Sequence, residues 1–267
     1  MQNLNKISLY ALSVFNLIWF SPIGLAAEPA SANTPLDGRF SMFVGTSYDT
    51  GDYGDPLDTD VWVIPIGLKY KTGLWSFGIS TSWLHVKSPN IVDADGNFIG
   101  GGGARTTEQG IGDINLSVKY NLLDDRNYFA GLDITGKLKI PTADEDKFLG
   151  SGKTDFGFNV EAYKTINDWT PYWNIGYKWK GDPDRIDYNN VWSTSLGLDY
   201  KVNHDLILGA SYDWQSKVTR FSDNVQEASI YANYYVNDNN KLNFYLLAGN
   251  GDSSPKWGTG LTLVHFF

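Results

Sequence analysis

Charged side chains spaced two residues apart stand out in the middle of the chain. Between Ala130 and Ile140, apolar residues alternate with Asp133, Lys137 and Lys139. Side chains two apart share one face of a strand, whereas a helix would scatter them around its axis. Charges aligned on such a face can pair between neighbouring strands or filter ions in a pore. The candidates for this chemistry are Asp113, Lys119, Asp133, Lys137, Lys139, Asp155 and Glu161.

Two interpretations of these charges remain open. In one, they solvate an aqueous interior and hold adjacent strands together by pairing. In the other, they form a selectivity ring, for which the nearest neighbours are Lys137 and Lys139 with Asp133 and Glu161.

Catalytic chemistry has little support in the sequence. An outer-membrane phospholipase would need a His beside a nucleophilic Ser. The three His are His85, His204 and His265, and none lies in such a motif. Without Cys there is no thiolate metal site. We therefore expect no enzyme, no catalytic or metal-binding residue and no cofactor; a lipid-modifying enzyme remains the alternative, with His85 as its one candidate base.

The alternation extends through most of the chain and defines the elements that would position the charges. Segments of this kind are about as long as a tilted strand that crosses a bilayer. The first three are less regular, because Val61 and Val63 fall on the polar parity. The twelve segments are 39–48, 61–70, 75–86, 110–123, 128–140, 154–166, 170–179, 191–202, 206–217, 225–236, 241–248 and 258–267.

The connections between the segments alternate strictly in length. Short polar turns such as 71–73 and 203–205 alternate with long loops such as 87–109 and 141–153. An even number of strands with short turns at one end and long loops at the other is typical of bacterial outer-membrane barrels. The sequence thus predicts an all-β fold, a 12-stranded antiparallel up-and-down transmembrane β-barrel, with both mature termini on the periplasmic, short-turn side.

Aromatic residues distinguish this barrel from a soluble β-sandwich, which would also alternate. On the apolar parity, aromatic residues lie at both ends of the strands and aliphatic residues between them. Two aromatic girdles follow from the two membrane interfaces and have no cause in a soluble core. The girdle residues are Trp62, Trp83, Trp179, Trp192, Tyr212 and Trp214 at the long-loop ends, and Tyr70, Trp75, Tyr120, Trp173, Tyr200 and Tyr234 at the short-turn ends.

The composition agrees with an exported membrane barrel. The 267 residues carry a formal charge of −9, and the mean hydropathy of −0.29 excludes a helical membrane protein. Because no basic cluster is present, we expect no nucleic-acid partner. Residues 1–27 have the charged, apolar and small-residue order of a signal peptide, with a membrane anchor as the alternative. The barrel then comprises residues 28–267 of a Gram-negative outer-membrane protein.

The C-terminus predicts how the barrel reaches its membrane. The chain ends in an amphipathic strand closed by Phe267. A terminal Phe in this context resembles the signal read by the barrel insertion machinery, although His265 stands where an aromatic residue is commoner. The expected partners are this machinery through Phe267, the outer-membrane lipids and lipopolysaccharide, and a small-molecule solute.

One stretch carries a family resemblance. Gly110-Ile111-Gly112-Asp113 is followed by Lys119-Tyr120, Lys139-Ile140-Pro141-Thr142, Gly150-Ser151-Gly152 and Asp155. This pattern resembles the outer-membrane transporter family of the meta-pathway of phenol degradation, which usually has Gly at the position of Ala143. The resemblance implies passage of small, often hydrophobic or aromatic, compounds. We therefore expect a passive channel or porin-like transporter, with a closed structural barrel as a further alternative.

Overall fold

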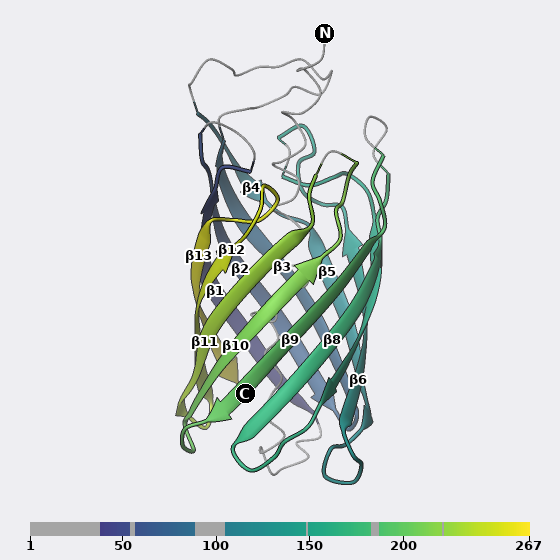
Figure 1. Ribbon diagram of the computed structural model, residues 1–267, viewed down its shortest axis with the longest axis vertical. Coiled ribbons are helices and arrows are strands. Elements are labelled where there is room, and N and C mark those ends of the chain that lie inside the picture. Colours follow the sequence, from purple (N-terminus) through teal and green to yellow (C-terminus); the bar gives the residue numbers. More distant parts are fainter. Residues whose placement is uncertain (1–37, 54–56, 89–104, 148, 183–186, 221) are drawn as a thin grey trace.

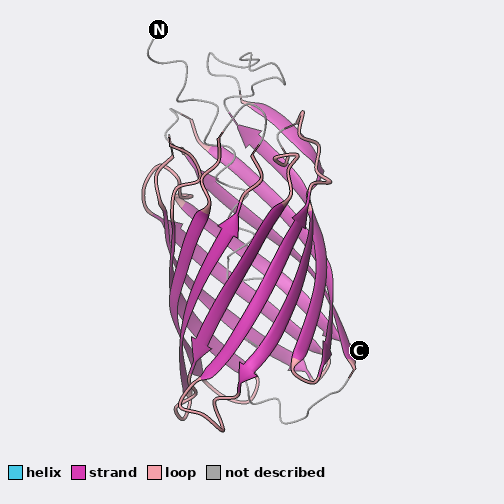
Figure 2. Ribbon diagram, turned by 90° about the vertical axis from the view of Figure 1, so that its right-hand side faces the viewer, coloured by secondary structure: helices cyan, strands magenta, loops and turns pink. Residues whose placement is uncertain are grey.

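In the computed structural model, the described residues form a closed antiparallel barrel (Figures 1 and 2). The structure describes residues 38–53, 57–88, 105–147, 149–182, 187–220 and 222–267. The predicted signal peptide lies outside these residues. Among them, no helix has the length and apolar character needed to cross a membrane.

Strands β1 to β13 follow one another around the barrel, each antiparallel to its neighbour. The sheet closes because β1 pairs with both β2 and β13, so that Ser41 lies opposite Phe266. Closure leaves no unpaired edge facing lipid. The bounds are β1 Arg39–Gly51, β2 Thr59–Thr72, β3 Trp75–Ser88, β4 Thr106–Ile111, β5 Ile114–Leu123, β6 Gly131–Ile140, β7 Asp155–Tyr163, β8 Trp169–Trp179, β9 Val191–Lys201, β10 Leu206–Gln215, β11 Val225–Asn237, β12 Asn240–Gly249 and β13 Trp257–Phe266.

The predicted fold is confirmed, with one refinement in the fourth segment. Both β4 and β5 pair with β3, so the thirteen elements make twelve strands around the barrel. The interruption falls at Gly112 and Asp113. There Gly112 N donates to Ser82 O at 2.7 Å, and the side chain of Asp113 receives hydrogen bonds from another loop. The family motif thus lies at a break in the strand.

The outer face is apolar and the inner face polar, as the alternation predicts. On β6, Asp133 and Lys139 are buried on the inner side, whereas Ile134 and Ile140 are exposed on the outer side. Most of the predicted girdle residues are exposed on the outer face: Trp62, Trp83, Trp179, Trp192, Tyr212, Trp75, Trp173, Tyr200 and Tyr234.

Two departures from the predicted pattern have local causes. Lys164, the one charge on the apolar parity, lies beyond the end of β7 in the structure. Its Nζ donates to the carbonyl oxygens of Asp125 (2.5 Å) and Tyr128 (3.2 Å) in the neighbouring short turn. Residues 128–130 belong to that turn, so β6 begins at Gly131 rather than at residue 128.

Candidate functional site: the inner wall of the barrel

The seven predicted inner-wall residues form two groups at different heights. Lys139 bridges Asp113 and Asp155 near the long-loop end, with Nζ to carboxylate distances of 3.2 and 3.3 Å. Toward the short-turn end, Lys119 pairs with Asp133. Of the four residues named for a selectivity ring, Lys137, Lys139, Asp133 and Glu161, Lys139 thus lies in the first group and Asp133 in the second. The side chain of Glu161 interacts electrostatically with Lys119 and Lys137.

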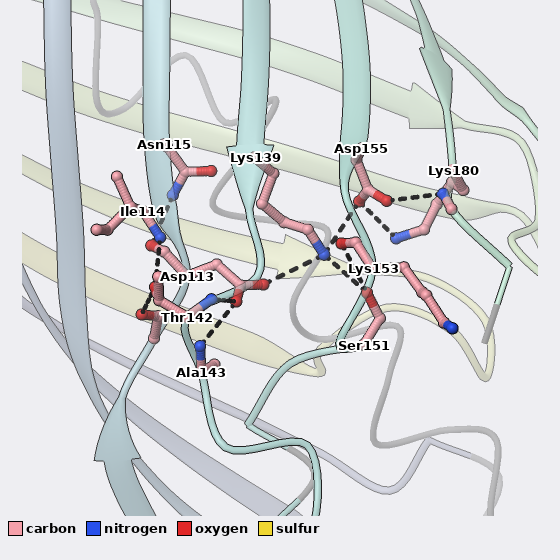
Figure 3. A network of polar contacts seen from close by, with 12 residues as sticks. Asp113, Ile114, Asn115, Lys139, Thr142, Ala143, Ser151, Lys153, Asp155 and Lys180 are labelled. Atoms are coloured by element: carbon pink, nitrogen blue, oxygen red, sulfur yellow. Dashed lines mark hydrogen bonds and ion pairs between the residues drawn. The ribbon is translucent and has the colours of Figure 1, made fainter. Parts of the chain in front are cut away.

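The upper group contains most of the family motif (Figure 3). The carboxylate of Asp113 accepts hydrogen bonds from the backbone N–H groups of Thr142 and Ala143, both at 3.0 Å. The hydroxyl of Thr142 donates to Gly112 O at 3.2 Å and accepts from Ile114 N at 3.0 Å. The motif residues, separated in sequence, thus fasten the start of loop 141–153 to the break between β4 and β5.

The network continues from Lys139 to β8. Lys139 Nζ donates to Ser151 Oγ at 2.8 Å, and Asp155 also pairs with Lys180 Nζ at 3.2 Å. Lys180 follows the end of β8, and burial lowers the pKa of its amine, an effect that the negative charge of Asp155 opposes. Alternating charges therefore neutralise each other across four adjacent strands, which we call the paired wall (β5 to β8).

Two glycines allow loop 141–153 to lie against this network. A methyl group at Gly150 would come within 3.0 Å of Asp113 Oδ1 and 2.8 Å of Ala143 Cβ. Gly152 has a φ of +63°, a conformation that L side chains rarely adopt. These contacts explain the second glycine pair of the motif in physical terms.

The same loop places an apolar side chain inside the barrel. Leu149 is 1% exposed and packs with Tyr53, Val61, Val63 and Leu84. Val61 and Val63 face inward, which accounts for their position on the polar parity of β2. These two side chains do not line a water-filled lumen, because Leu149 of loop 141–153 packs against them. Sequence alternation marked these two valines but did not reveal the loop residue that they meet.

A second part of the inner surface, β9 to β11 together with β1, carries different polar side chains, and we call it the acidic wall. Its inward carboxylates are Asp49, Asp199, Asp213 and Glu227. The hydrogen bonds to Asp199 and Asp213 come from hydroxyl groups: Tyr231 OH donates to Asp199 at 2.5 Å, and Ser211 Oγ to Asp213 at 2.8 Å. None of these residues was among the predicted site residues.

Two tyrosine rings, Tyr231 on this wall and Tyr172 on the adjacent strand β8, lie along the sheet rather than across the lumen. Tyr172 is opposite Gly197, and Tyr231 is opposite Gly209, on neighbouring strands. A methyl group at either glycine would collide with the ring, so each ring covers the glycine beside it. The two hydroxyl groups are 3.1 Å apart. Glycines in the strands thus let large side chains face inward without projecting toward the axis.

The structure gives the surroundings of His85, the one candidate base of the enzyme alternative. His85 lies near the long-loop end of β3, where its ring nitrogen is 3.3 Å from Gln109 Oε1. Among the residues that the structure describes, no group of three or more His, Cys, Asp or Glu could hold a metal ion.

The family described as "Putative MetA-pathway of phenol degradation" matches residues 57–267, and the chain belongs to it. No curated protein sequence matches. An outer membrane channel from Pseudomonas putida F1 is similar in structure, with a TM-score of 0.68 and 17% identity, over 90% of this chain and 100% of that one.

The translocator domain of the autotransporter NalP from Neisseria meningitidis is also similar. Its TM-score is 0.54 and its identity 9%, over 96% of each chain. Both comparisons show the outer-membrane barrel fold.

Proposed function

We propose that this member of the phenol-degradation family is a passive outer-membrane channel for small molecules, hydrophobic or aromatic ones among them. The observation that carries the proposal is the contrast between the two faces of one closed sheet. The outer face is aliphatic with aromatic ends, whereas the inner face carries charged and hydroxyl side chains along its whole height. Buried charges of this number require water or partners, and an aqueous lumen supplies the water.

The solute class rests on the family description and on the chemistry of the acidic wall. A phenol combines an apolar ring with one hydroxyl group. Tyr231 on the wall and Tyr172 beside it on β8 offer aromatic surface beside hydroxyl groups, and Asp199 offers a carboxylate acceptor. These groups could bind both parts of such a molecule in passing, and transport of this kind needs no catalytic residue.

Export and orientation complete the proposal. Residues 1–27 would act as the signal peptide in a Gram-negative cell, and Phe267 would direct insertion. Both mature termini would then be periplasmic. In the structure, the C-terminus and the short turns lie at the same end of the barrel (Figure 1), which agrees with this orientation.

Ion conductance in planar lipid bilayers tests the proposal. We expect discrete single-channel currents from the purified barrel. Ser229→Trp should reduce the conductance, because Ser229 is buried on the inner face of β11. Ile230→Trp is the matched control, since the next residue is 60% exposed on the outer face and should leave the current unchanged. Absence of current in the unsubstituted, correctly folded barrel would refute the channel.

A further inference from the structure

Large rings on the inner face of the barrel lie over glycines of the neighbouring strand. Five inward-facing aromatic residues are directly opposite a glycine, and a methyl group at each of these glycines would come closer than 3.0 Å to the ring. Each ring therefore occupies space that the Cβ of any other residue would need. The pairs are Phe43 with Gly67, Tyr163 with Gly131, Tyr172 with Gly197, Tyr231 with Gly209 and Tyr245 with Gly260.

Gly209 lies between two side chains that meet above it. It is directly opposite Asp199 on β9 and Tyr231 on β11. Tyr231 OH donates a hydrogen bond to Asp199 Oδ1 at 2.5 Å, and a methyl group at Gly209 would lie 2.5 Å from the same oxygen. The hydrogen bond thus holds the ring of Tyr231 down on the glycine.

The tyrosines on β7, β8, β11 and β12 are linked to one another. The hydroxyl oxygens of Tyr172 and Tyr231 are 3.1 Å apart. Tyr163 lies directly opposite Tyr172, and Tyr231 lies directly opposite Tyr245 and packs against it. Four rings, each placed over a glycine, therefore form a band along the inner face of the sheet.

The position of these rings affects the space left inside the barrel. In small barrels the interior is filled by side chains, whereas wider barrels enclose a channel. A ring that lies over a glycine runs along the sheet, because the glycine has no side chain to displace it. A ring opposite a residue with a Cβ would have to turn away from the sheet, toward the axis. The glycines thus determine how much of the cross-section these rings leave free.

We propose that Gly197 and Gly209 set the size limit of the lumen for solutes, because they allow Tyr172 and Tyr231 to lie against the wall. This role rests on the channel function proposed above and adds the residues that determine its specificity for solute size. Asp199 acts with them as a positioning residue, since its carboxylate holds the ring of Tyr231 over Gly209.

Single-channel conductance in planar bilayers tests the proposal with three variants. Gly209→Ala should lower the conductance about twofold or more, because the displaced ring of Tyr231 enters the lumen. The double variant Gly209→Ala, Tyr231→Ala should restore at least the unsubstituted value, since no ring remains to be displaced. Gly136→Ala is the matched control and should change nothing, because Gly136 is exposed on the outer face of β6 and an added methyl group meets no atom within 4 Å.

Swelling of proteoliposomes in glycerol and in glucose tests the size limit itself. Gly209→Ala should lower the ratio of the glucose rate to the glycerol rate at least about twofold, because the larger solute is hindered more by a narrower lumen. The double variant should keep the ratio of the unsubstituted barrel. A glycine that serves packing alone would leave the ratio unchanged in all variants.

Heat-modifiable mobility in electrophoresis establishes that each variant is folded. If Gly209→Ala does not fold, Gly197→Ala, alone and combined with Tyr172→Ala, takes its place. Unchanged conductance and an unchanged rate ratio in the folded glycine variant, or a low conductance that persists in the double variant, would overturn the proposal while the unsubstituted barrel still conducts. Absence of current from the unsubstituted barrel would refute the channel function, and the proposed size limit with it.

Discussion

The two walls of the lumen carry similar residue types in opposite arrangements. On the paired wall, Lys139 lies between Asp113 and Asp155, and Lys119 pairs with Asp133. On the acidic wall, Asp213 is bonded to serine hydroxyls, and Glu227 keeps an oxygen without a partner. The same charge on two strands of one barrel thus has two consequences. Where a cation is adjacent, the carboxylate stabilises the fold; where none is, it remains available to a solute.

The contrast between the two walls distinguishes residues that stabilise the fold from residues that remain available to a solute. The distinction does not depend on how high a residue lies along the barrel axis. The family motif belongs to the paired wall, where it joins loop 141–153 to the strands. The motif therefore stabilises the architecture, and specificity would reside on the acidic wall. Removal of a charge from the paired wall should destabilise the fold, whereas removal of a charge from the acidic wall should cost no stability.

The largest effect is expected for Lys139→Met. The change leaves Asp113 and Asp155 without their shared cation, and breaking a buried ion pair typically costs about 3–5 kcal/mol. Since the lumen contains water, we expect the lower end, about 3 kcal/mol, in urea unfolding. Glu227→Gln on the acidic wall is the matched comparison and should cost nothing or stabilise. Equal losses in the two variants would contradict the distinction between the walls.

Leu149→Ala tests whether loop 141–153 depends on its inward contact. Loss of a buried Leu side chain costs about 2–5 kcal/mol, and since the loss falls on the loop alone we expect the lower end, about 2 kcal/mol. We expect faster trypsin cleavage after Lys147 or Lys153, while the strands remain intact. Leu246→Ala on the lipid-facing side of β12 is the control. If the loop stays resistant in Leu149→Ala, its attachment rests on the polar network alone.

Tyr231→Phe should have a smaller effect on the acidic wall. The substitution removes the hydrogen bond to Asp199 and the contact with Tyr172, worth about 1 kcal/mol. Tyr234→Phe, on the outer face of the same strand, should be nearly neutral. A loss comparable to that of Lys139→Met would show that the acidic wall is as structural as the paired wall.

The smallest effect is expected at an ion pair outside the lumen. In the short turn, hydrogen bonds from Arg126 lower the pKa of Asp124 to about 2. The carboxylate therefore stabilises the folded state above its unfolded pKa, and this contribution is lost as the pH falls toward 2. Because Arg126 is fully exposed, Arg126→Ala should lower the stability at pH 7 less than any of the destabilising lumen substitutions above. A larger loss in urea titration would mean that exposed pairs rival those of the lumen.

The number of strands and the side of the sheet that each residue faces were predictable, because alternation with a period of two residues can be seen within a short stretch of sequence. Asp133 and Ile134 could be assigned to opposite faces from their order alone, and the structure confirms this assignment. Strand ends were less predictable: Lys164 and residues 128–130 proved to be turn, because carbonyl groups of another segment position them.

The pairing of charges was not predictable from sequence. Which cation meets Asp113 depends on strand register and on loop 141–153, both set by contacts distant in sequence. The acidic wall was missed for a related reason. Asp199, Asp213 and Glu227 alternate with apolar residues as the paired carboxylates do, and they differ in that no Lys lies directly opposite them on the neighbouring strands. That signal could have been found by comparing predicted adjacent strands.

Charge-dependent modification of introduced cysteines tests the central contrast most directly. The chain has no Cys, so Ser229→Cys on the acidic wall and Thr135→Cys on the paired wall each provide one thiol, with lipid-facing Ile230→Cys as the control. Cationic and anionic methanethiosulfonates of similar size are compared by reaction rate. The account predicts that the cationic reagent is faster by about tenfold or more at Ser229→Cys, that the rates are nearly equal at Thr135→Cys, and that Ile230→Cys in lipid does not react. The same rate ratio on both walls, or no reaction at either inner position, would contradict it.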